Sequence, residues 1–185
     1  MSSLSSGVLG MAIFVFGLLS DADVEWIAQA GVQRPIRNGE VLIEEGQPVN
    51  SVIFLLQGEC VVTERSAGEI ARLGVGEIVG EMSFLDSQAP SATVTASGNG
   101  LALFLDKETL ADKLEADVAF GCRFYRALAV FLTNRMRKTT RRMGSALDLA
   151  AKSVAKDDPE IHFPNALSKA RARFDHLLKS LVGER

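Results

Sequence analysis

Residues 76–94 read GEIVGEMSFLDSQAPSATV, and this stretch is the most informative part of the sequence. Gly80 and Glu81 open a short apolar helical turn, after which a loop of small residues leads into a β-branched strand. Free N–H groups at the start of a helix, together with the helix dipole, favour an anion. The stretch therefore predicts a backbone turn that can hold a phosphate.

On both sides of this turn, residues 32–105 predict an antiparallel roll or barrel. Short runs rich in β-branched residues alternate with turn signals, as is typical of all-β architectures. Glycines suit such turns because they permit positive φ or close approach of backbone segments. The predicted strands are residues 41–43, 52–56, 60–63, 92–95 and 101–105.

Helices are predicted before and after the strands. Ser20, followed by acidic residues, is a typical helix start, and that helix is expected to end near Gly31. Asp106 is the expected cap of a second helix, and a long helix is expected over residues 116–143. The first half of the long helix is apolar nearly all round, so more than one of its faces must be covered. A second copy of the chain is the preferred cover, and the tail at residues 144–185 is the alternative.

The run from Gly76 to Glu81, with turn glycines Gly39, Gly46 and Gly58 upstream, resembles the cyclic nucleotide-binding domain family over about residues 14–143. The resemblance implies a mainly β fold with flanking helices: an antiparallel β-roll, similar to a double-stranded β-helix. It also implies a long C-terminal helix that packs on the roll and against its twin in a homodimer.

The resemblance divides the chain into three parts. These are an apolar N-terminal extension at residues 1–13, the domain at residues 14–143 with its long helix at 116–143, and a helical tail at residues 144–185. The tail shows no turn followed by a recognition helix, so no DNA-binding domain is expected in it.

The family's ligand site can be transferred to matching positions. The resemblance implies that Gly80 and the amides after it approach the cyclic phosphate, and that Glu81 accepts a hydrogen bond from the ribose 2′-hydroxyl. Residues on the long helix contact the purine in some members. The predicted ligand-binding residues are Gly80, Glu81, Met82, Ser83, Pro90, Ser91, Thr139 and Thr140.

One position departs from the family pattern. The family has an arginine that pairs with the cyclic phosphate, and Pro90 stands at that position here. Such a charge-assisted pair contributes about 1.5–3 kcal/mol, and proline supplies neither a side-chain donor nor an N–H. Three interpretations stay open. The site binds cyclic AMP or cyclic GMP weakly, or with a substitute cation from Arg65, Arg72 or a partner's long helix; it binds another anion; or it is vacant.

Composition and motifs exclude several classes of protein. The chain has 185 residues, of which 47% are hydrophobic and 23% charged, as in an ordinary globular protein. It has no nucleophile–base pair, metal-ligand cluster or Walker-type loop, so we predict no catalytic residue, metal site or cofactor apart from a cyclic nucleotide ligand. Cys60 and Cys122 are expected to be buried thiols of a cytoplasmic protein.

Charge and hydropathy predict the partners. Residues 123–185 hold fourteen of the twenty basic residues, which favours an acidic partner or packing between unlike ends in an oligomer. The apolar stretch at residues 8–19 is too short to cross a bilayer, which takes about 20 residues. We therefore expect protein contacts through residues 8–19 and 165–182, no specific DNA partner and no membrane role.

The prediction is a non-enzymatic regulatory or sensor module, dimeric through residues 116–143, with ligand binding altered by Pro90. The alternative is a ligand-independent scaffold that forms part of a larger assembly. A transcription regulator ranks third.

Overall fold

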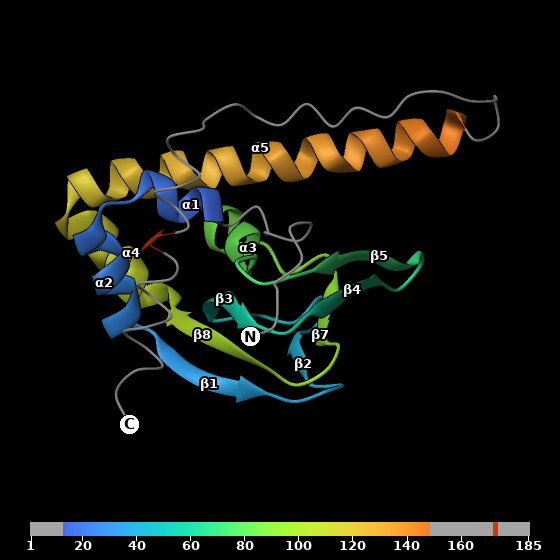
Figure 1. Cartoon of the computed structure of the whole chain (residues 1–185), viewed down its shortest axis with the longest axis horizontal. Coiled ribbons are helices and arrows are strands. Elements are labelled where there is room, and N and C mark those ends of the chain that lie inside the picture. Colours follow the sequence, from blue (N-terminus) through green and yellow to red (C-terminus); the bar gives the residue numbers. More distant parts are fainter. Residues whose placement is uncertain (1–12, 149–171, 174–185) are drawn as a thin grey trace.

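The computed structural model describes residues 13–148 and 172–173, and within them the strands form two antiparallel sheets (Figure 1). The first sheet has the order β1 (Val32–Ile36), β8 (Gly100–Asp106), β3 (Ser51–Gln57) and β6 (Ile78–Val79). The second has the order β2 (Val41–Ile43), β7 (Thr93–Ala96), β4 (Cys60–Glu64) and β5 (Gly68–Leu73). The predicted mainly β fold is confirmed.

The five predicted strands correspond to β2, β3, β4, β7 and β8, whereas β1, β5 and β6 were not predicted. Strand β1 contains Pro35, which cannot donate to a neighbouring strand. The sheet tolerates it because β1 is an edge strand and pairs only with β8. Strand β5 is also an edge strand and is mostly exposed, so it lacks the apolar run that marks a buried strand.

The helices begin where the capping residues predicted. Helix α2 (Asp21–Ala30) has a capping box, in which Ser20 Oγ accepts from the N–H of Asp23 and the Asp23 carboxylate accepts from the N–H of Ser20. Helix α4 (Lys107–Ala116) is capped by Asp106, whose carboxylate accepts from the N–H of Thr109 at 2.9 Å. The remaining helices are α1 (Ile13–Leu18), α3 (Glu81–Asp86) and α5 (Val118–Asp148). In Figure 1, α5 lies across the top of the view, with α1 and α3 beneath it.

Strand β3 divides the core into two clusters because alternate side chains point to opposite faces of a sheet. Phe54 joins the cluster formed with the helices, and Ile53 joins the cluster between the two sheets. Both side chains are buried, in keeping with the apolar residues on both faces of this strand. The helical cluster includes the fully buried rings of Phe16, Phe54, Phe120, Phe124 and Phe131.

Two arginines hold the start of α2. Arg123 of α5 makes two hydrogen bonds to the Asp23 carboxylate, of 2.6 and 2.8 Å. Arg173 binds the Asp21 carboxylate and donates to backbone carbonyls at the end of α1, including Leu19 O and, at 3.2 Å, Gly17 O. The last carbonyls of a helix lack partners within the helix, and a basic side chain can bind them. Residue 173 therefore contacts the helices that begin the described chain.

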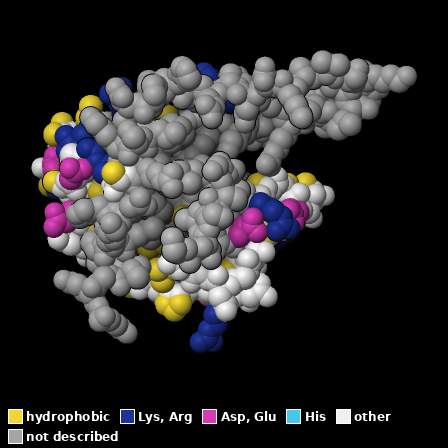
Figure 2. All heavy atoms as spheres, in the orientation of Figure 1, with side chains coloured by type: hydrophobic (Ala, Val, Ile, Leu, Met, Phe, Trp, Pro, Cys, Tyr) yellow, Lys and Arg dark blue, Asp and Glu magenta, His cyan; other side chains and the backbone are white. Residues whose placement is uncertain are grey.

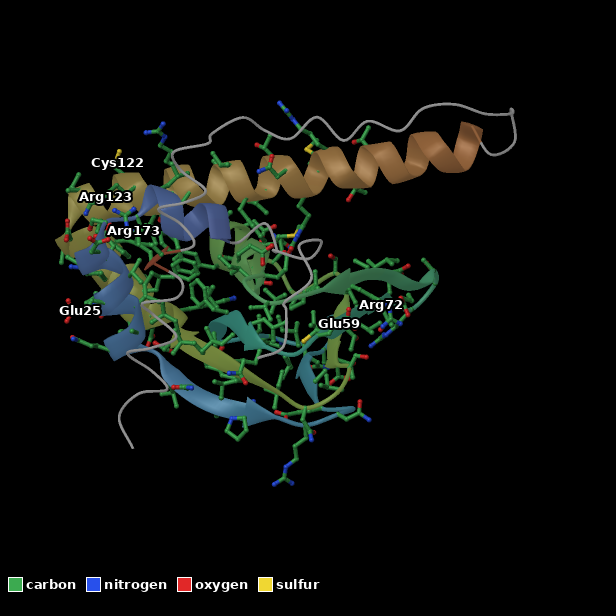
Figure 3. All side chains as sticks on the ribbon, viewed as in Figure 1. Glu25, Glu59, Arg72, Cys122, Arg123 and Arg173 are labelled. Carbon is green, nitrogen blue, oxygen red and sulfur yellow. The ribbon has the colours of Figure 1, made fainter. Side chains whose placement is uncertain are left out.

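One cysteine differs from the prediction: Cys60 is buried, but Cys122 is exposed on α5. Cys122 lies on the side of α5 that faces away from the roll (Figure 3). The hydrophobic periodicity did not identify this side, because this part of α5 is apolar on several sides. Within the described chain, no helix combines the length and the apolarity needed to span a bilayer. Most of the predicted partner segments, residues 8–19 and 165–182, lie outside the described residues, as does most of the tail.

Candidate functional site

A cavity of about 650 Å³ opens beside Gly80. It is bounded by strands of the second sheet, by α3, by the loop after α3 and by one turn of α5. Its size falls within the range of small-molecule sites. We call it the Gly80 cavity.

Gly80 is required at this position for two reasons. Its φ is +83°, in the left-handed region that glycine adopts without strain. A Cβ atom at this position would also lie 2.6 Å from the carbonyl oxygen of Ser51. The turn therefore depends on the absence of a side chain, as the sequence motif indicated.

Glu81 is the first residue of α3 and is only 2% exposed. Its carboxylate is ion-paired with the guanidinium of Arg135, which comes from α5. Burial raises the pKa of Glu81 above its usual value, although the positive charge of Arg135 opposes this effect. The pair joins α3 to the long helix at the wall of the Gly80 cavity.

Arg135 has further partners in the same place. It donates to the backbone carbonyl of Ile78 at 3.0 Å, and its guanidinium lies 3.6 Å from the Glu77 carboxylate. The guanidinium carbon also lies over an aromatic face, 4.6 Å from the ring centroid of Phe131. These contacts fix the direction of the side chain into the cavity.

The sequence did not single out Arg135, and the expected substitute cation was Arg65, Arg72 or a residue of a partner's long helix. In the structure, Arg135 of the same chain supplies a cation beside Glu81. A signal was present, because Arg135 lies four residues before Thr139, and residues spaced by four lie on one face of a helix.

Pro90 lines the Gly80 cavity in the loop after α3. Its carbonyl oxygen accepts a hydrogen bond from the N–H of Gly46 at 2.8 Å, which ties the loop to the turn after β2. Proline brings no donor toward the cavity at the position where the resemblance implies an arginine.

Most of the predicted site residues meet in this cavity. Thr140 is not among the residues that line it; its hydroxyl donates to the Met136 carbonyl at 3.0 Å. Thr139 lies at the rim and donates to the Arg135 carbonyl at 3.1 Å. The predicted residues that line the cavity are Gly80, Glu81, Met82, Ser83, Pro90, Ser91 and Thr139.

The two arginines considered as substitute cations are engaged elsewhere. Arg72 lines the cavity but makes two hydrogen bonds to Glu69, of 2.8 and 3.0 Å. It also lies 3.5 Å from Glu59. Figure 2 shows basic side chains flanked by acidic ones on this part of the surface, and Figure 3 labels Arg72 beside Glu59 at the end of the second sheet. Arg65 does not line the cavity and lies 3.9 Å from Glu45.

Comparison with known proteins concerns the family and the fold. Residues 33–117 match the family model of the cyclic nucleotide-binding domain. Glutaminase 2 of Bradyrhizobium diazoefficiens is 32% identical over 122 residues, which is 64% of this chain and 19% of that protein. The chain spans about a fifth of the length of the curated relatives that it matches.

Two solved structures share the fold. A cyclic nucleotide-binding domain from Methylobacillus flagellatus aligns with a TM-score of 0.66 over 80% of this chain and 89% of that chain, at 22% identity. The catabolite activator protein of Thermus thermophilus aligns with a TM-score of 0.60 over 92% of this chain and 87% of that chain, at 20% identity. At these identities the likeness concerns the fold, and it confirms the predicted β-roll with a long C-terminal helix.

Proposed function

We propose that this chain is a non-enzymatic regulatory module with a ligand site in the Gly80 cavity, on the premise that residues 33–117 belong to the cyclic nucleotide-binding domain family. The observation that carries the proposal is the contact between Glu81 and Arg135. It places a side chain of the long helix against the carboxylate that, by the family resemblance, meets the ligand's ribose.

This contact provides a route from ligand to helix. A ribose hydroxyl that donates to Glu81 competes with the Arg135 guanidinium for the same carboxylate oxygens. Ligand binding therefore weakens the contact between Arg135 and Glu81, and so changes the free energy with which α5 is held against the roll. Couplings of this kind typically amount to about 1–3 kcal/mol. Helix α5 packs on α1, so a shift of α5 reaches the N-terminal helices.

Cyclic nucleotides are expected to bind weakly. Loss of one charge-assisted pair to the phosphate costs about one to two decades of affinity. Pro90 leaves that contact unmade, and the arginines that line the cavity already have carboxylate partners.

A homodimer through α5 is part of the proposal. Val118, Tyr125 and Met136 are 79%, 48% and 72% exposed on this helix. With Cys122 and Ala129 they follow one another at intervals of four, three, four and seven residues, a heptad spacing typical of helices that pair along a seam. An exposed apolar stripe of this kind favours a second copy of α5 as its cover.

Calorimetric titration with cyclic AMP and cyclic GMP tests the ligand site, and the fluorescence of Trp26 reports the response. Trp26 is the only tryptophan, and its ring centroid lies 5.3 Å from that of Phe120 on α5. We expect weak, saturable binding that changes the Trp26 emission. Glu81→Gln should lose both effects, whereas Glu108→Gln, at an exposed position of α4, should keep them.

Absence of binding up to millimolar ligand, or binding that does not depend on Glu81, would refute the proposed sensor function. The ligand-independent scaffold would then be the better account of the fold.

A further inference from the structure

The charged side chains that line the Gly80 cavity are mainly acidic. Glu77, Glu81 and Asp86 contribute carboxylates, and Arg72 and Arg135 contribute guanidinium groups. Among the described residues, these five are the charged side chains of the lining. Carboxylates thus outnumber cations in a site that belongs to a phosphate-binding family.

Both cations are also committed to carboxylates. Arg135 binds Glu81 and lies near Glu77, and it donates to a backbone carbonyl. Arg72 points its guanidinium at Glu69, with Glu59 close by. An incoming phosphate would have to break one of these pairs, or else lie near carboxylates without a cation of its own.

The rest of the lining suits an uncharged ligand. Ile43, Val62, Leu73, Val79 and Val94 supply an apolar wall, which can accept the face of a base. Glu81 is buried, and its carboxylate has lone pairs beyond those that face Arg135, so it can also accept a hydrogen bond from a sugar hydroxyl. The cavity therefore offers contacts for base and sugar but no unengaged cation for a phosphate.

We propose that the Gly80 cavity prefers an uncharged ribonucleoside to the corresponding cyclic nucleotide. This inference rests on the proposed function, because it names the ligand class of the same site. Sugar hydroxyls donate to Glu81, the base packs on the apolar wall, and removal of the phosphate removes repulsion from Glu77 and Asp86.

Titration of the full chain with four probes tests the preference: adenosine, guanosine and the two corresponding cyclic nucleotides. The better nucleoside should bind with a dissociation constant about tenfold below that of its cyclic nucleotide. Its 2′-deoxy analogue should bind about tenfold more weakly than the nucleoside, because it lacks a hydroxyl for Glu81.

Pro90→Arg should reverse the preference. The substitution leaves the Pro90 carbonyl available to Gly46, and it sacrifices no hydrogen bond, because proline has no N–H. The ratio of the two dissociation constants should shift by about 10- to 100-fold in favour of the cyclic nucleotide, because an arginine here adds a cation for the phosphate. Pro35→Arg, on the exposed edge strand β1, is the matched control and should change neither. If Pro90→Arg fails to fold, Ala89→Arg, at an exposed position that also lines the cavity, serves in its place.

The outcomes separate the two proposals. A cyclic nucleotide that binds the unaltered protein more tightly than its nucleoside overturns the preference and leaves the regulatory site in place. If no probe binds, the site itself is wrong. Nucleoside binding that does not depend on the 2′-hydroxyl also contradicts the inference, because Glu81 then has no part in it.

Discussion

At the scale of single residues, Gly80 shows how a local backbone need fixes an amino acid. Positive φ alone makes a non-glycine residue unfavourable, and the nearby Ser51 carbonyl adds a steric reason. Gly46 has a similar φ of +77° but nothing within 4 Å of the place where a Cβ would lie. A comparison of the two positions therefore distinguishes backbone strain, which both share, from steric collision with a neighbour, which occurs at Gly80 and not at Gly46.

The first prediction compares these two positions. Gly80→Ala should destabilise the fold by more than Gly46→Ala, for which about 1 kcal/mol of backbone strain is expected. Gly80→Ala should also disturb the cavity, because the turn must move away from Ser51. Urea unfolding measures the free energies, and equal losses for the two variants would contradict the steric argument.

The second prediction concerns the pair formed by Glu81 and Arg135. Arg135→Leu leaves a buried carboxylate without its cation, so it should lower the free energy of unfolding by about 2–3 kcal/mol. The double variant Arg135→Leu with Glu81→Gln removes the unpaired charge and should recover much of that loss. Urea unfolding of the single and double variants checks both values; a double variant as unstable as Arg135→Leu would show that the charge was not the cause.

The site residues were predictable where the signal was local. Gly80, Glu81 and Pro90 lie within one short stretch, so their spacing alone assigned them to one site. Arg135 is separated from Glu81 by 54 positions, and the register of a helix cannot be carried over that distance from sequence. Its partner became clear only when α5 was placed on the roll.

At the scale of elements, the start of α2 combines a capping box with a link to α5. Burial alone would raise the pKa of Asp23, but hydrogen bonds from Arg123 and Ser20 outweigh it and hold the pKa below its usual value. The folded state therefore favours the ionised form. The resulting stabilisation is present above the ordinary aspartate pKa of 3.8 and is lost as pH falls through the lower folded value.

The third prediction follows from this sign. Asp23→Asn should lower the free energy of unfolding by about 1–3 kcal/mol near neutral pH, and the difference from the unaltered protein should shrink below pH 3.8. Asp112→Asn, at an exposed position of α4, is the control and should change little at any pH. Unfolding curves collected across the acid range provide the test, and a pH-independent difference would argue against the ion pair.

Strand and helix starts were predictable to different degrees. The caps at Ser20 and Asp106 are short-range hydrogen bonds, so sequence located both helices well. Strand β2 was also found with its observed bounds. Strands β1 and β5 were missed because both bury little, and because β1 contains a proline and β5 contains charged residues.

At the scale of the whole molecule, the exposed stripe on α5 is the surface through which we propose that two copies of the chain associate. The fourth prediction is that Tyr125→Glu shifts the protein toward monomer, because a charge would then lie in the apolar seam between two helices. Val32→Glu, on β1, also replaces an exposed apolar residue and should leave the oligomeric state unchanged. Sedimentation velocity over a range of concentrations measures the oligomeric state. An unaltered protein that stays monomeric would refute the dimer.

The sheet order shows why the complete topology was beyond sequence reasoning. The antiparallel roll followed from short strands and turn glycines. That β1 pairs with β8, however, depends on residues about seventy positions apart, such as Val32 and Phe104, and no local pattern specifies the partner. The sequence analysis accordingly predicted neither β1 nor its pairing with β8.

The contact of Arg173 with Leu19 and Asp21 has a geometric consequence. The chain returns at residue 173 to the place where its first described helices lie. These contacts join segments 152 positions apart, and they must offset the conformational entropy that is lost when so long a loop is closed.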